Sequence, residues 1–134
     1  MLVENNDPNW LATYSKGSAA EYGEGEILKK IANTIGGNDI KWFVEFGAGN
    51  GLSASNSRSF ITEMNYAAVL IEPMNARYQA LSKLYEEYKN VITLNNFVGF
   101  EGEDRLDNLL SDTDIPKNFD ILSIDIDGND YHVW

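Results

Sequence analysis

The chain has 134 residues, 43% hydrophobic and 23% charged, a composition typical of one small globular domain rather than of a disordered segment. Ten Lys and Arg stand against 21 Asp and Glu, and the net charge of -11 makes nucleic acid and anionic membranes unfavourable partners. The absence of cysteine excludes disulfides and thiolate metal ligands, and without a signal peptide or a membrane-length apolar run we expect a cytoplasmic protein.

Helical and strand patterns alternate along the chain. Residues 1–25 are polar and contain glycine, which predicts an N-terminal arm ahead of a domain over residues 26–134. An apolar helical stripe followed by Gly36 and Gly37 predicts the first helix and its end. Helices are predicted over 26–35, 52–64, 75–88 and 105–110, with strands over 41–46, 67–71, 91–94 and 119–124. This order is typical of an α/β fold, an open and mostly parallel sheet with helices on both faces.

A glycine-rich loop follows the first predicted strand. Residues 44–51 read Val-Glu-Phe-Gly-Ala-Gly-Asn-Gly, with glycines at alternate positions 47, 49 and 51. Glycine permits positive φ and leaves no Cβ between main chain and ligand, so such a loop is typical of nucleotide binding. A dinucleotide fingerprint would place its third glycine one residue later, where Leu52 stands.

The second and third predicted strands also end in polar residues. Glu72, 27 residues after Glu45, is followed by Pro73 at the end of the second strand. A carboxylate there can accept both hydroxyls of a ribose, and the alternative is a cap for the helix that follows. After the third strand, Asn96 is suited to the edge of a nucleobase and Phe97 or Val98 to its face. An Asx turn with a core phenylalanine remains the alternative.

The fourth predicted strand ends in acidic residues. Asp125 and Asp127 would share one side of a continuing strand, at the edge where open α/β sheets bind ligands. They are interpreted as cofactor and acceptor contacts, as ligands of a divalent metal, or as part of a turn and helix cap formed with Asn129 or Asp130. The position of Gly128 excludes a calcium loop of the EF-hand type. His132 has the pKa range of a general base, and the alternative is an exposed helical residue.

Together these segments resemble a known family. The pattern Glu-x-Gly-x-Gly-x-Gly over 45–51, Val-Leu-Ile-Glu-Pro over 69–73 and the stretch 119–134 resemble class I S-adenosylmethionine-dependent methyltransferases of the FkbM-like branch. Residues 23–28 resemble the segment that precedes the first helix of that branch. This chain departs from it in having Glu21 in place of glutamine and Gly25-Glu26 in place of Asp-Gly.

The resemblance implies a Rossmann-like sheet with strand order 3-2-1-4, which is the first part of the seven-stranded sheet of that family. It also implies S-adenosyl-L-methionine as cofactor and O-methyl transfer to a hydroxyl of a small molecule or glycan. The chain is therefore expected to be the N-terminal half of the domain, truncated after the fourth strand and inactive alone. Its free fourth strand is expected to promote self-association.

The predicted site contains eleven cofactor-binding residues, three catalytic candidates and no resident metal. The cofactor is expected to contact Glu45, Gly47, Ala48, Gly49, Asn50, Gly51, Glu72, Pro73, Asn96, Phe97 and Asp125. The candidates for the general base are Asp125, Asp127 and His132. The alternative functions are a non-catalytic nucleotide-binding half-domain or interaction module, and a nicotinamide-dependent oxidoreductase.

Overall fold

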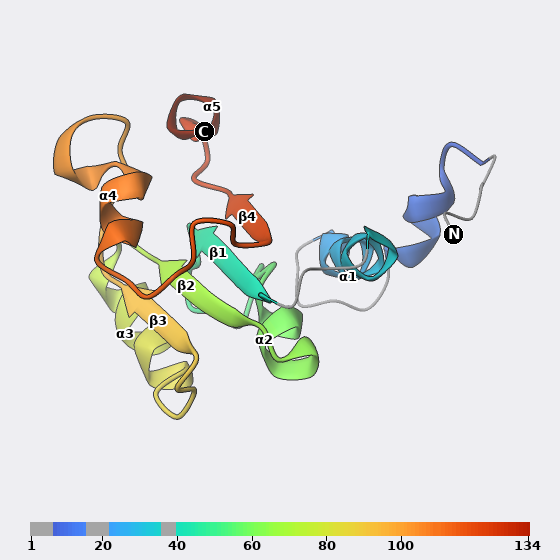
Figure 1. The fold of residues 1–134 in the computed structure, drawn as a ribbon, viewed down its shortest axis with the longest axis horizontal. Coiled ribbons are helices and arrows are strands. Elements are labelled where there is room, and N and C mark those ends of the chain that lie inside the picture. Colours follow the sequence, from blue (N-terminus) through green and yellow to red (C-terminus); the bar gives the residue numbers. More distant parts are fainter. Residues whose placement is uncertain (1–6, 16–21, 36–39) are drawn as a thin grey trace.

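A parallel four-stranded sheet forms the centre of the protein. The computed structural model describes residues 7–15, 22–35 and 40–134. Its strands are β1 (Trp42–Phe46), β2 (Ala67–Ile71), β3 (Val91–Leu94) and β4 (Ile121–Ile124). They lie in the order β3-β2-β1-β4 and every neighbouring pair is parallel (Figure 1). The predicted fold class and strand order are confirmed, with β1 central and β4 at one edge.

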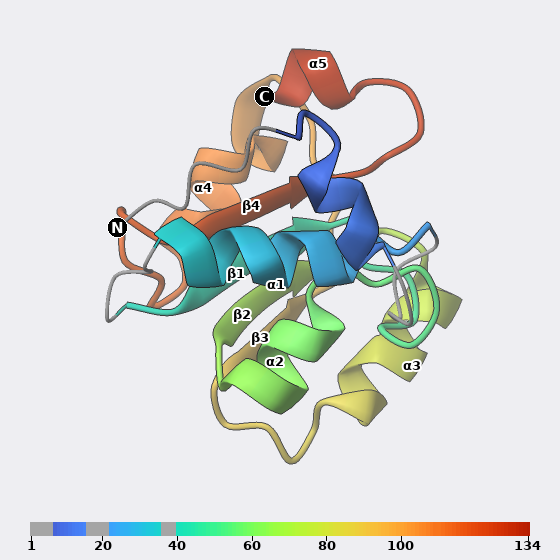
Figure 2. The ribbon, with the colours of Figure 1, turned by 90° about the vertical axis from the view of Figure 1, so that its right-hand side faces the viewer.

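Helices cover both faces of this sheet. They are α1 (Glu24–Ile35), α2 (Arg58–Met64), α3 (Asn75–Leu84), α4 (Leu106–Ser111) and α5 (Asp130–Val133), with the short 3-10 helices η1 (Trp10–Tyr14) and η2 (Gly102–Asp104). Side chains of α1, α2 and α3 pack on one face and those of α4 and α5 on the other. Figure 2 looks onto the first of these layers, in which α1 crosses in front of the sheet beside α2. Among the described residues, no helix has the length and apolar character needed to cross a membrane.

The alternation of side chains along β1 explains why helices are needed on both sides. Phe43 points into the α1–α3 layer, whereas Val44 and Phe46 point into the α4–α5 layer. All three side chains are at most 1% exposed. A strand buried on both faces reads as a nearly continuous apolar run, and that is the pattern of this segment.

Aromatic packing fixes α2 against the sheet. The ring of Phe60 is fully buried and lies 5.1 Å, centroid to centroid, from both Phe43 and Tyr66. The contact with Tyr66 is edge-to-face, an arrangement that aromatic quadrupoles favour. This cluster ties the helix to the strand before it and to the start of the strand after it.

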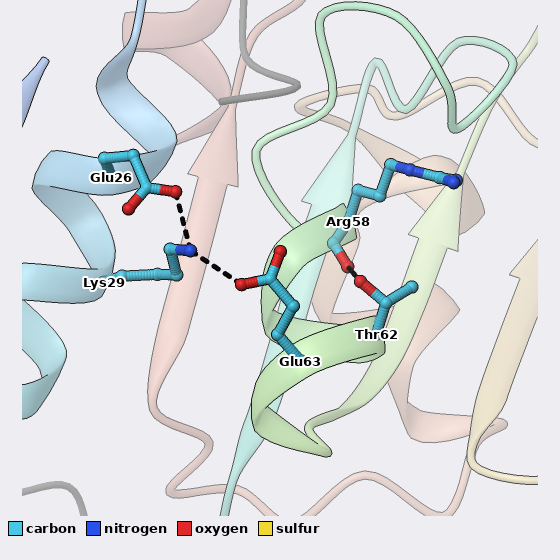
Figure 3. Close-up of polar contacts among 5 residues, drawn as sticks. All are labelled: Glu26, Lys29, Arg58, Thr62 and Glu63. Atoms are coloured by element: carbon cyan, nitrogen blue, oxygen red, sulfur yellow. Dashed lines mark hydrogen bonds and ion pairs between the residues drawn. The ribbon is translucent and has the colours of Figure 1, made fainter. Parts of the chain in front are cut away.

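A lysine links α1 to α2 at the surface of the same layer (Figure 3). The Lys29 ammonium lies 2.6 Å from a Glu26 carboxylate oxygen and donates a 2.8 Å hydrogen bond to Glu63 of α2. These two contacts, that with Glu26 first, raise the pKa of Lys29. Within α2, the Thr62 hydroxyl donates to the Arg58 carbonyl oxygen at 2.9 Å.

Two predicted helices are shorter than expected. The helix predicted over 52–64 begins only at Arg58, because side-chain acceptors take the earlier backbone N–H groups: Asn50 Oδ1 accepts from Leu52 and Ser53. The helix predicted over 75–88 ends at Leu84, where the backbone bonds tighten to the i→i−3 pattern, as in Tyr88 N–H to the Tyr85 carbonyl oxygen.

Smaller differences concern element ends and the N-terminal arm. The fourth strand begins at Ile121 rather than 119, and the Asp120 carboxylate just before it accepts a hydrogen bond from the Trp42 N–H at 3.0 Å. Helix α1 begins at Glu24, inside the arm predicted over 1–25, which also contains η1. The predicted helix stop at Gly36 and Gly37, like much of the arm, lies outside the described residues.

We predict that packing, not ion pairing, holds the α2 layer in place. Phe60→Ala should lower the free energy of unfolding by about 3–5 kcal/mol through the cavity it leaves. Glu63→Gln, which removes one arm of the Lys29 contact, should cost less than about 1 kcal/mol because the Glu63 side chain is 61% exposed. Urea denaturation of both variants measures the difference, and a cost for Glu63→Gln equal to that of Phe60→Ala would contradict this account.

Candidate functional site

The carboxyl ends of β1, β2 and β4 open onto a cleft of about 520 Å³. Open α/β sheets bind ligands at this edge, and the volume is within the usual range for small-molecule sites. The cleft is lined by Phe46, Gly47, Gly49, Asn50, Ser53, Ala54, Ile71, Glu72, Pro73, Met74, Arg77, Asn96, Phe97, Val98, Asp125, Ile126 and Asp127. The loops that follow all four strands therefore converge on this cleft.

Two glycines of the first loop are required by close approach of other segments. A Cβ on Gly47, which has φ of 79°, would lie 1.9 Å from the Asp125 carbonyl oxygen. A Cβ on Gly51, with φ of 73°, would lie 2.7 Å from Leu81 Cδ1 on α3. Gly47 thus lets the end of β4 pass beside the loop, and Gly51 lets the loop lie against α3. A Cβ on Gly49 would meet nothing within 4 Å, because this residue faces the cleft.

The Glu72 carboxylate joins two of the loops that form the cleft. Its side chain is only 2% exposed although it lines the cleft wall. One oxygen accepts a 2.8 Å hydrogen bond from the Gly49 N–H and the other a 2.9 Å bond from the Met74 N–H. Met74 is itself the N-cap residue of α3, which has no side-chain cap hydrogen bond, so the alternative that Glu72 caps this helix is wrong. A carboxylate oxygen has a second lone pair, so both oxygens retain capacity to accept ligand hydroxyls.

Asn95 reinforces the same corner, although the sequence patterns did not single it out. Its side-chain amide donates to the Glu72 carbonyl oxygen at 2.7 Å and to the Pro73 carbonyl oxygen at 3.1 Å. The end of β3 is thereby fixed against the end of β2. The available signal was its position directly after a strand, where an amide side chain satisfies the carbonyl groups of a neighbouring turn.

Glu45 lies below the cleft rather than in it. Strand alternation turns its side chain, 3% exposed, toward the segment before α2. Its carboxylate accepts hydrogen bonds from the Asn56 N–H at 2.8 Å, from the Ser57 hydroxyl and N–H, and from the Ser55 hydroxyl. Burial raises the pKa of Glu45, and these four donors partly oppose the shift. Glu45 therefore shapes the loop that leads into α2.

Acidic residues after β4 form the opposite wall. The strand ends at Ile124, as predicted, so it does not continue through Asp125 and Asp127, and both residues line the cleft. Asp127 has a φ of 56°, a left-handed conformation that is uncommon outside glycine. Asp130 holds this turn: its carboxylate accepts from the N–H groups of Ile126 and Gly128 at 2.8 and 2.9 Å, which lowers the pKa of Asp130.

His132, the third catalytic candidate, lies outside the cleft. It lines a separate cavity of about 440 Å³ between α4 and α5. Its ring centroid is 6.2 Å from that of Phe100 and 5.7 Å from that of Tyr131. The predicted catalytic set is thus divided, with the two aspartates in the cleft and the histidine in an aromatic environment beside it.

The loop after β3 contributes one exposed aromatic residue. Phe97 is 59% exposed and Val98 is 5% exposed, and both line the cleft together with Asn96. The alternative that Phe97 is a core residue is wrong, since Val98 takes the buried position. An exposed phenylalanine at the mouth of a cleft provides a flat apolar surface for a planar ligand group.

Most predicted cofactor contacts are brought together. Eight of the eleven line the cleft: Gly47, Gly49, Asn50, Glu72, Pro73, Asn96, Phe97 and Asp125. Glu45, Ala48 and Gly51 support the loop from behind. Lining residues that the sequence patterns did not single out are Ser53, Ala54, Met74, Arg77 and Ile126. In the part of the chain that is described, no group of three or more His, Cys, Asp or Glu residues is arranged to hold a metal ion.

Comparison with known proteins adds no assignment. No protein-family model matches the sequence, and no curated protein matches it. The function of this cleft therefore has to be argued from its own geometry and charge.

We predict a clear order of sensitivity along the glycine loop. Gly47→Ala should strongly destabilise the fold, because a main-chain oxygen occupies the space of the new Cβ. Gly49→Ala should cost only about 1–2 kcal/mol, the penalty of a left-handed conformation for an L-residue, because the surrounding space is open. Urea denaturation tests the order, and a Gly49→Ala variant less stable than Gly47→Ala would refute the placement of the β4 end.

We also predict a pH-dependent contribution from Glu45. Because its pKa is raised on folding, the protonated group stabilises the fold below its ordinary pKa, and that contribution is lost as the pH rises through the folded-state pKa. From about pH 4.5 upward, the stability of Glu45→Gln should therefore improve relative to the wild-type chain. Urea denaturation across pH measures this slope, with Glu87→Gln as an exposed control. Parallel curves for Glu45→Gln and the wild type would contradict the raised pKa.

Proposed function

We propose that the protein is an S-adenosylmethionine-dependent methyltransferase that binds its cofactor in the 520 Å³ cleft. The observation that carries the proposal is the junction between Gly49 and Glu72. A glycine with open space above it lies one hydrogen bond away from a carboxylate at the end of the next strand. That combination fits a nucleoside whose ribose hydroxyls approach Glu72 while the rest of the ligand runs over the loop.

The charge of the cleft favours this cofactor over a nicotinamide dinucleotide. Glu72, Asp125 and Asp127 line the cleft, and Arg77 is the one basic residue among its described lining residues. An excess of carboxylates attracts a sulfonium and opposes a negatively charged pyrophosphate. The same excess agrees with the overall net charge of -11.

The residues of the cleft would hold and orient the two reactants. Glu72 would accept hydrogen bonds from the ribose, and Asn96 and Phe97 would contact the base. Asp125 and Asp127, on the wall formed after β4, are placed to orient a hydroxyl acceptor and to take its proton. When bound, S-adenosylmethionine supplies a methyl group on a positively charged sulfonium, so that positioning and exclusion of water are the main demands on the protein.

Calorimetric titration of the chain with S-adenosylmethionine tests this function. Gly49→Val should abolish binding, because a branched side chain would occupy the space of the ligand. Glu72→Gln should weaken binding about tenfold or more, since charge-assisted hydrogen bonds contribute about 1.5–3 kcal/mol each. Glu72→Gln is preferred to Glu72→Ala because it retains an acceptor for one of the two backbone N–H groups.

Controls separate this proposal from its alternatives. Glu63→Gln, a surface change on α2 outside the cleft, should bind like the wild type. Binding of NADH in preference to S-adenosylmethionine would favour the oxidoreductase. A folded wild-type chain that binds neither S-adenosylmethionine nor NADH would favour an interaction module.

A further inference from the structure

Arg77 occupies a distinct position at one end of the cleft. It lies in the first turn of α3, three residues after Met74, and lines the cleft with it. Phe97, from the loop after β3, lines the same cleft. Met74 and Phe97 are 54% and 59% exposed, so the cleft presents a polarisable and a flat apolar side chain to solvent.

Among the described residues, no ion pair involves the guanidinium of Arg77. Within the described ranges, the ion pairs closer than 4.0 Å are formed by Lys29 and Arg105. Arg77 is exposed, on a helix whose buried contact with the sheet is made by Leu81. Because Arg77 is exposed and lines the cleft, its planar group is accessible to a ligand there.

The chemistry of the surroundings decides which ligand group it would contact. An arginine can bind a phosphate or carboxylate, and it can stack on the face of an aromatic ring. A ligand anion at this end would face the nearby Glu72 carboxylate and a cleft with two further aspartates. A neutral purine carries no charge for these groups to repel, and its π-face attracts a cation.

We propose that Arg77 stacks on the purine base of the bound nucleoside, in the cleft that Met74 and Phe97 also line. This inference rests on the proposed function, since it assigns the base end of the same ligand. It adds a residue of α3 to a site otherwise built from strand-end loops. Because the contact is made by a planar group, its contribution depends on shape as well as on charge.

Fluorescence or calorimetric titration with adenosine and with S-adenosylmethionine tests the role of Arg77. Arg77→Lys should weaken both ligands about fivefold or more, because an ammonium retains the charge but has no plane to stack. Arg77→Gln, which loses both the charge and the guanidinium plane, should weaken both ligands at least as much as Arg77→Lys. Lys83→Ala, an exposed change in the last turn of the same helix, should leave both affinities unchanged. Circular dichroism checks that each variant is folded.

The outcomes separate this inference from the proposed function. Full affinity in Arg77→Lys would overturn the stacking role. A variant that loses binding of NADP but keeps binding of NAD would also overturn it, because Arg77 would then contact an anion. A wild type that binds adenosine but not S-adenosylmethionine would overturn the proposed function. Loss of that adenosine binding in the Arg77 variants would still support the base contact. Unchanged binding of S-adenosylmethionine in all variants would overturn only the inference, and a wild type that binds neither ligand would overturn both.

Discussion

The close approach of two main-chain segments, at Gly47 and Asp125, is the constraint on which the cleft depends. Parallel strands bring their carboxyl ends to one edge of a sheet, but side chains normally keep the exits apart. Here the Asp125 carbonyl oxygen occupies the space of a Cβ on Gly47. The loop after β4 can therefore lie directly beside the glycine loop. The acidic wall and the glycine floor belong to one site for this reason.

Around this site, side-chain oxygens accept the backbone hydrogen bonds that regular secondary structure would otherwise satisfy. Buried or partly buried backbone N–H groups need acceptors, and loops do not supply them in a regular pattern. The Glu45 carboxylate accepts from the segment before α2, and that of Glu72 accepts from the N–H groups of Gly49 and Met74. The Asp130 carboxylate accepts from N–H groups in the turn after β4. Three of the 21 acidic residues thus accept structural hydrogen bonds at this edge of the sheet.

The fold was predictable from sequence to a greater extent than the roles of single residues. The apolar runs of β1 and β2 and the glycine loop define strand ends and crossovers, because burial on both faces leaves a strong pattern. The start of α2 was not predictable, since it depends on Asn50 and Glu45 accepting hydrogen bonds from nearby N–H groups.

The orientation of Glu45 away from the cleft follows from strand alternation, whereas the exposure of Phe97 depends on Val98 filling the core. The separation of His132 from the aspartates arises from the turn that Asp130 closes, which residue spacing does not reveal.

The two hydrogen bonds of Glu72 have a kinetic consequence. Because one nearly buried carboxylate holds both the glycine loop and the start of α3, neither segment can move outward without breaking a charge-assisted bond. Because the two bonds use different carboxylate oxygens, either segment can open while the other stays bonded, and each opening costs one charge-assisted hydrogen bond.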